Sequence, residues 1–96
     1  LAPKDPIIID TLGWALFKLN QLAEAEKYLL QAVNLVRNDP VIADHLGDLY
    51  FKNGDYQKAQ DFWSRSINSG TEPDEIKKVR EKLEKLQEKL RQKNPK

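Results

Sequence analysis

The chain has 96 residues and a formal net charge of +1, and it contains no cysteine. A near-neutral charge argues against a protein that binds nucleic acid as a whole, and the missing thiols exclude disulfides and thiolate metal sites. No apolar run approaches the ~20 residues that a membrane-spanning helix needs, so we expect no direct membrane insertion.

The first helix is predicted over residues 6–19. Asp5 can accept a hydrogen bond from the unpaired amides of a first turn, and Pro6 loses no bond at the first helical position. Apolar residues then recur at steps of three and four, which predicts one buried face. The residues predicted to form this face are Ile8, Ile9, Leu12, Ala15, Leu16 and Leu19.

Gly13 lies in the middle of this helix, although glycine there costs about 1 kcal/mol relative to alanine. We expect close approach of a second helix to offset that cost. The second helix is predicted over residues 22–36, after a turn at Asn20 and Gln21, with Ala25 as the small residue opposite Gly13.

Asp39 and Pro40 repeat the start signal and predict a third helix. This helix should end at Gly54, because glycine readily takes the left-handed conformation that closes a helix. A fourth helix follows the turn and should stop at Gly70. The residues predicted to point inward from these two helices are Ile42, Leu46, Leu49, Tyr50, Ala59, Phe62, Trp63 and Ile67.

A fifth helix is predicted over residues 72–93, with apolar residues in a heptad-like seam. The seam consists of Ile76, Val79, Leu83, Leu86 and Leu90. Two interpretations stay open. The helix can cap the exposed edge of the preceding pair, as arrays of helical pairs require. Alternatively, Leu86 and Leu90 can project outward and pair with another chain.

The two helical pairs are copies of one unit with a period of 34 residues. The aligned identities are Asp5/Asp39, Pro6/Pro40, Ile8/Ile42, Asp10/Asp44, Leu12/Leu46, Gly13/Gly47, Phe17/Phe51, Lys18/Lys52, Ala25/Ala59 and Asn34/Asn68. Each copy shows the same pattern of residue types. It begins with Leu-Gly, has a large residue three positions after the Gly and Ala twelve positions after the Gly, and has Ala or Ser seven positions after that Ala. This pattern resembles the tetratricopeptide repeat (TPR).

The resemblance implies an all-α fold, a right-handed α-solenoid of two helix-turn-helix hairpins plus a long C-terminal helix. We expect one domain over residues 1–96, with repeats at about 6–39 and 40–70 and a capping helix at about 72–93. Two helical pairs fall below the three that such arrays usually need for stability. A self-associating structural module is therefore the alternative to a binding scaffold, dimerising through Ile7 and Ile8 at the N-terminal edge or through the C-terminal helix.

In TPR proteins the first helix of each pair lines a concave groove, so the resemblance implies a set of groove residues. They are Asp10, Trp14, Phe17, Lys18, Asp44, Asp48, Phe51 and Lys52. Aromatic rings beside an acidic strip suit a protein or peptide ligand whose apolar anchor is flanked by Lys or Arg. In the competing interpretation, other repeats or the fifth helix cover the rings, and the aspartates only solubilise this face.

One TPR subtype grips a partner's C-terminal carboxylate with Lys and Asn at the positions held here by Asp10 and Trp14, so we do not predict that subtype. His45 is the only histidine, and the four glycines form no phosphate-binding loop. We therefore predict a non-enzymatic scaffold that needs neither cofactor nor metal.

The chain begins at Leu1 and contains no methionine, so we expect it to be a fragment of a longer protein. The sequence of the first repeat resembles the C-terminal part of longer bacterial TPR proteins, several of which work at the cell envelope. Neither the ligand nor the compartment, bacterial cytoplasm or envelope, follows from that resemblance.

Overall fold

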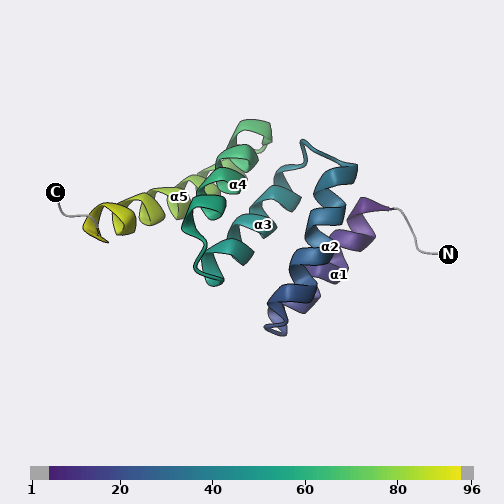
Figure 1. Ribbon diagram of the computed structural model, residues 1–96. Coiled ribbons are helices and arrows are strands. Elements are labelled where there is room, and N and C mark those ends of the chain that lie inside the picture. The colour runs from purple at the N-terminus through teal and green to yellow at the C-terminus, as the bar shows by residue number, and fades with distance from the viewer. Residues whose placement is uncertain (1–4, 94–96) are drawn as a thin grey trace.

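The computed structural model describes residues 5–93, and this part of the chain is helical without strands. Its helices are α1 (Pro6–Lys18), α2 (Leu22–Leu35), α3 (Pro40–Lys52), α4 (Tyr56–Ser69) and α5 (Pro73–Lys93). They form a row that runs from α1 and α2 at one end, through α3, to α4 and α5 at the other (Figure 1). The molecule is an all-α solenoid, as the sequence predicts.

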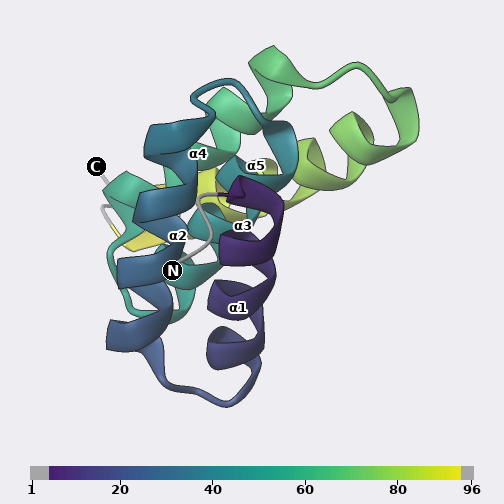
Figure 2. The ribbon, with the colours of Figure 1, turned by 90° about the vertical axis from the view of Figure 1, so that its right-hand side faces the viewer.

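Each hairpin consists of two antiparallel helices joined by a short turn, and Figure 2 shows the first one, α1 and α2, nearest the viewer. The helices within a hairpin pack on one another, α2 also packs on α3, and α4 packs on α5. A smaller contact joins α1 directly to α3. The two first-of-pair helices are therefore neighbours on one face of the row.

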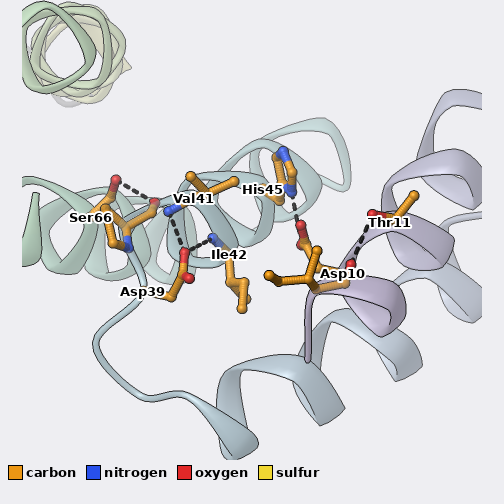
Figure 3. Close-up of polar contacts among 9 residues, drawn as sticks. Asp10, Thr11, Asp39, Val41, Ile42, His45 and Ser66 are labelled. Carbon is orange, nitrogen blue, oxygen red and sulfur yellow. Dashed lines mark hydrogen bonds and ion pairs between the residues drawn. The ribbon is translucent and has the colours of Figure 1, made fainter. Parts of the chain in front are cut away.

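The predicted start signals are confirmed in both hairpins. The Asp5 carboxylate accepts a hydrogen bond from the Ile7 amide at 2.9 Å, and Asp39 accepts from Val41 at 2.8 Å and from Ile42 at 3.1 Å (Figure 3). Each carboxylate satisfies amides that have no partner inside the first helical turn.

The turns inside the two hairpins share one left-handed residue at the same repeat position. Asn20 has a φ of 64°, and Gly54, 34 residues later, has a φ of 84°. Asparagine and glycine are the residues that reach this region most readily. The third helix ends at Lys52, two residues before Gly54, and Gly54 closes the turn as predicted.

The core corrects the predicted partner of Gly13. A Cβ at Gly13 would lie 2.8 Å from Cγ of Leu29, whereas Ala25 is not among the nearest groups. At the equivalent Gly47 a Cβ would lie 2.1 Å from Cδ1 of Trp63, which is the repeat counterpart of Leu29. Both glycines therefore let a large side chain lie directly on the backbone of the first helix of the pair.

The fifth helix caps the second hairpin. Val79 and Leu86 are buried in the common core, and Leu83 and Leu90 are partly buried against it. Leu86 is 1% exposed, so it has no surface to offer a second chain, which corrects its assignment as a self-association residue. The heptad-like seam is used within the chain.

The predicted buried face of the first helix is only partly correct. Ile8 and Leu12 are 52% and 45% exposed, whereas their counterparts Ile42 and Leu46 are 2% and 0% exposed. The reason is the order of the row, because α2 packs on α3 but no described residue lies in the equivalent place beside α1. Leu19, at the end of α1, is also exposed.

Candidate functional site

A polar contact and a stack of rings join α1 to α3. His45 Nδ1 lies 2.8 Å from Asp10 Oδ1, and the two side chains point toward one another between the helices (Figure 3). The imidazole of His45 stacks on the indole of Trp14, with ring centroids 4.0 Å apart. Trp14 in turn stacks on Phe17 at 4.7 Å. We call Trp14, Phe17 and His45 the ring platform.

The ring platform is half-buried, and two lysines lie over its rings. The ammonium group of Lys18 lies 5.3 Å from the centroid of the Trp14 ring, and that of Lys52 lies 5.8 Å from the centroid of Phe17. Both lysines are exposed. These cation–π contacts place positive charge beside the rings without removing it from water.

Asp44 and Asp48, which belong to the predicted acidic strip on this face, are bridged by one lysine of the fifth helix. Lys82 Nζ lies 2.6 Å from Asp44 Oδ1 and 2.8 Å from Asp48 Oδ1. One ammonium group thus offsets two carboxylates that stand one helical turn apart and would otherwise repel. Asp44, Asp48 and Lys82 therefore form a partly exposed ion cluster, in which the two carboxylates already have a basic partner.

Burial and charge act in opposite directions on this ion cluster. Burial raises the pKa of the Asp48 carboxyl, and the neighbouring Asp44 charge adds to that rise, although hydrogen bonding to Lys82 works against it. Burial disfavours the ammonium charge of Lys82, but hydrogen bonds to Asp44 and Asp48 outweigh it, so its pKa is raised. The lysine is therefore held in its charged form.

The same scheme recurs along the row. Asp10 and Asp44 occupy the same position in the two repeats, and each pairs with a side chain from a helix later in the chain. For Asp10 this is His45 of α3, and for Asp44 it is Lys82 of α5. The fifth helix therefore supplies a polar partner to the aspartate of α3, just as α3 supplies one to the equivalent aspartate of α1.

Basic side chains of the fifth helix also lie over aromatic rings of the second hairpin. Lys82 Nζ is 5.5 Å from the centroid of Trp63, and Lys89 Nζ is 5.9 Å from that of Phe51. The capping helix thus reaches part of the predicted groove, at Phe51, Asp44 and Asp48. The ring platform on the α1 side is separate from these contacts.

Two residues of this surface were not predicted from the sequence. His45 was assigned no binding role, although it lies on the helix face that also carries Asp44. The sequence predicts no binding role for Lys82 of the fifth helix either. A period of 34 residues relates pairs within the repeats, but the fifth helix is not an aligned copy, so the sequence held no signal for the reach of Lys82.

Two further findings concern the described part of the chain as a whole. Within residues 5–93 no helix combines the length and the apolar composition needed to cross a bilayer. Across the same residues no three His, Asp or Glu side chains gather as a possible metal site.

Comparison with known proteins identifies the repeats. Two family models, each described as a tetratricopeptide repeat, match residues 8–38 and 43–67, which together span more than half of the chain. The chain belongs to the TPR family. TPR repeats generally mediate protein–protein interactions.

A TPR repeat-containing protein of Pseudomonas aeruginosa is 48% identical to this TPR chain over 33 residues. That match covers 34% of the chain and 6% of the relative, so the chain spans only a small part of the curated relative it matches. No solved structure matches.

Proposed function

We propose that this TPR module binds a protein segment on the face formed by α1 and α3, with the ring platform as the main contact. The observation that carries the proposal is the continuous stack of Trp14, Phe17 and His45 across the two helices. Aromatic groups that are flat, half-exposed and held in place by neighbours are typical anchors of binding energy at interfaces. A partner's apolar side chain can lie on these rings without reordering them.

The charges around the ring platform define how a bound segment is oriented. The exposed ammonium groups of Lys18 and Lys52 lie over its rings and can pair with a carboxylate of the segment. A basic residue of the segment that pairs with Asp44 or Asp48 competes with Lys82, which already bridges them. The predicted role of these two aspartates as direct ligands for Lys or Arg therefore depends on that competition.

The experiment is a selection from a random displayed peptide library, followed by fluorescence anisotropy with the enriched peptides. We expect Trp14→Ala to weaken binding about tenfold or more. Leu19→Ala, which also removes an exposed apolar side chain but lies outside the ring platform, should bind as the parent does. Circular dichroism and thermal melting of both variants show that the helices persist. Unchanged affinity of Trp14→Ala, or the absence of any enriched peptide, contradicts the proposal.

A second candidate function is self-association through the N-terminal edge. The observation that favours it is the exposure of Ile8 and Leu12, whose repeat counterparts are buried. A second copy that covers these side chains would supply the missing packing surface and remove apolar area from water. Ile7, 70% exposed, belongs to the same edge.

Multi-angle light scattering over a hundredfold concentration range tests this candidate. We expect a dimer at high concentration, and a monomer for Leu12→Glu, because a carboxylate at the edge opposes its burial. Gln87→Glu, an exposed position on α5, adds the same charge away from the edge and should dimerise like the parent. A parent chain that stays monomeric throughout removes self-association as a function.

A further inference from the structure

A cavity of about 240 Å³ opens where the start of α3, the end of α4 and the start of α5 meet. Its apolar lining includes Pro40, Val41, Ile76 and Val79. This volume is below the range of pockets that hold whole small-molecule ligands, which begins at about 300 Å³. The cavity therefore suits a single apolar side chain presented by a larger partner.

Contacts within the protein hold the walls of this cavity in place. The Ser66 hydroxyl donates a hydrogen bond to the Pro40 carbonyl at 2.8 Å, which ties the end of α4 to the start of α3 (Figure 3). Gly70 allows α5 to approach closely, because a Cβ there would lie 2.9 Å from Cγ1 of Ile76. The lining is thus preorganised before any ligand arrives, which reduces the entropy lost on binding.

The cavity continues the ring platform. His45 lines the cavity and also stacks on Trp14, so one side chain belongs to both surfaces. A segment that lies on Trp14 and crosses α3 therefore reaches the cavity at its next contact. Val41, 56% exposed, stands at the opening.

The charge at the opening is acidic. The lining includes Asp44, Glu72 and Glu75 but no Lys or Arg. Asp44 already pairs with Lys82, whereas the ion pair of Glu75 within the described residues is with Lys78 at 3.5 Å, and both side chains of that pair are about 70% exposed. Such exposed pairs contribute little. Within residues 5–93 Glu72 forms no ion pair, so Glu72 and Glu75 are available to a cation.

We propose that this cavity is the specificity pocket of the bound segment, taking one aliphatic side chain that is followed or preceded directly by Lys or Arg. The aliphatic group enters between Val41, Ile76 and Val79, and the cation pairs with Glu72 and Glu75 at the rim. The basic residue expected from the sequence is thus met at this rim by Glu72 and Glu75, and not by Asp44, which already pairs with Lys82. This assignment deepens the proposed function and rests on its statement that the module binds a protein segment, but not on the role of Trp14.

The test fills the cavity without touching the core. Val41→Trp places a bulky ring at the opening, and the side chain it replaces is already exposed. Leu35→Trp is the matched control, because Leu35 is also an exposed apolar side chain of a helix and lines no part of the cavity. The probes are the most enriched peptide of the random displayed library, labelled with fluorescein, and the same peptide with its Lys or Arg replaced by Glu.

We expect enriched peptides to share an aliphatic residue next to Lys or Arg. Val41→Trp should weaken their binding about tenfold or more, while Leu35→Trp leaves it unchanged. Replacing Glu72 and Glu75 together by Gln should weaken the parent peptide and leave the Glu-substituted peptide unaffected. That second variant is informative even if Val41→Trp disturbs α3.

The outcomes separate the two proposals. If Trp14→Ala weakens binding and Val41→Trp does not, the cavity assignment is overturned and the groove proposal stands. If Val41→Trp weakens binding and Trp14→Ala does not, the cavity is supported and the ring platform loses its role. Enriched peptides that lack the basic residue, or a library that yields none, overturn the cavity assignment.

Discussion

His45 of the second repeat contacts Asp10 of the first, with Nδ1 and Oδ1 2.8 Å apart. Asp10 is 8% exposed, so its carboxylate depends on this partner more than a surface carboxylate would. The imidazole also stacks on the indole of Trp14. One side chain therefore joins the two repeats, satisfies a buried acid and orients the ring platform.

We expect His45→Ala to lower the free energy of unfolding by about 1–3 kcal/mol, because it leaves the Asp10 carboxylate unsatisfied. Urea denaturation followed by circular dichroism measures the change. Thr11→Ala is the matched control, since Thr11 holds the same repeat position but its hydroxyl bonds only to the Ile7 carbonyl within α1. Equal stabilities of the two variants would mean that the inter-repeat contact contributes nothing.

Replacement of Lys82 by Met keeps the length of the side chain and removes the charge that bridges Asp44 and Asp48. We expect a loss of about 1–2 kcal/mol at pH 7, between the values typical of exposed and of buried ion pairs. Lys78→Met, in the exposed pair with Glu75, should change stability by less than about 0.5 kcal/mol. Urea denaturation of both variants against the parent gives the comparison.

The effect of Lys82→Met should depend on pH in a defined direction. The pKa of Asp48 is raised above its ordinary 3.8, so the folded protein binds a proton there more readily than the unfolded chain does. As the pH falls through that raised pKa, protonation relieves the repulsion between Asp44 and Asp48, and the loss in the variant should shrink. In the parent, the pKa of Lys82 is raised above 10.5, so its stabilisation is complete below 10.5 and is lost as the pH rises through the raised value. A loss that is the same at pH 7 and pH 3 would contradict the ion-cluster assignment.

Gly47→Ala should destabilise more than Gly13→Ala, although both gain about 1 kcal/mol of helix propensity. The new methyl at Gly47 would lie 2.1 Å from Cδ1 of the rigid indole of Trp63, whereas the one at Gly13 would lie 2.8 Å from Cγ of Leu29, which is a smaller overlap. We expect a net loss of about 1–3 kcal/mol at Gly47 and less at Gly13. Adding Trp63→Leu to Gly47→Ala replaces the indole by the smaller side chain that the first repeat has at Leu29, so it should recover part of the loss in thermal denaturation, and a further loss would count against this packing.

Much of this fold follows from local signals in the sequence. Asp5 and Asp39 mark helix starts by the amides they satisfy, and Asn20 and Gly54 mark turns by their backbone freedom. These effects act within a few residues, so they can be recognised without knowing the rest of the structure. The 34-residue period then places the second hairpin beside the first.

The failures have one physical cause, which is packing between elements distant in the sequence. Leu12 and Leu46 are the same residue in the same repeat position, yet only Leu46 has a helix beside it. Likewise, Asp48 looks like any surface acid until α5 brings Lys82 to it. At the ends of a row of repeats, the exposure and ion pairing of a residue depend on whether another helix packs beside its repeat. A comparison of the two repeat sequences does not contain that information.

The fifth helix offers the clearest measure of how far capping stabilises the second hairpin. Leu86→Ala removes a side chain that is 1% exposed, so we expect a loss of about 2–5 kcal/mol from transfer and cavity terms together. Leu90→Ala, at a partly buried position near the end of the same helix, should lose less, and Leu19→Ala, at an exposed position, should lose less than about 0.5 kcal/mol. Chemical denaturation of the three variants gives the ranking. A small loss for Leu86→Ala would instead indicate that the fifth helix is free of the core in solution and that its apolar seam is open to another chain.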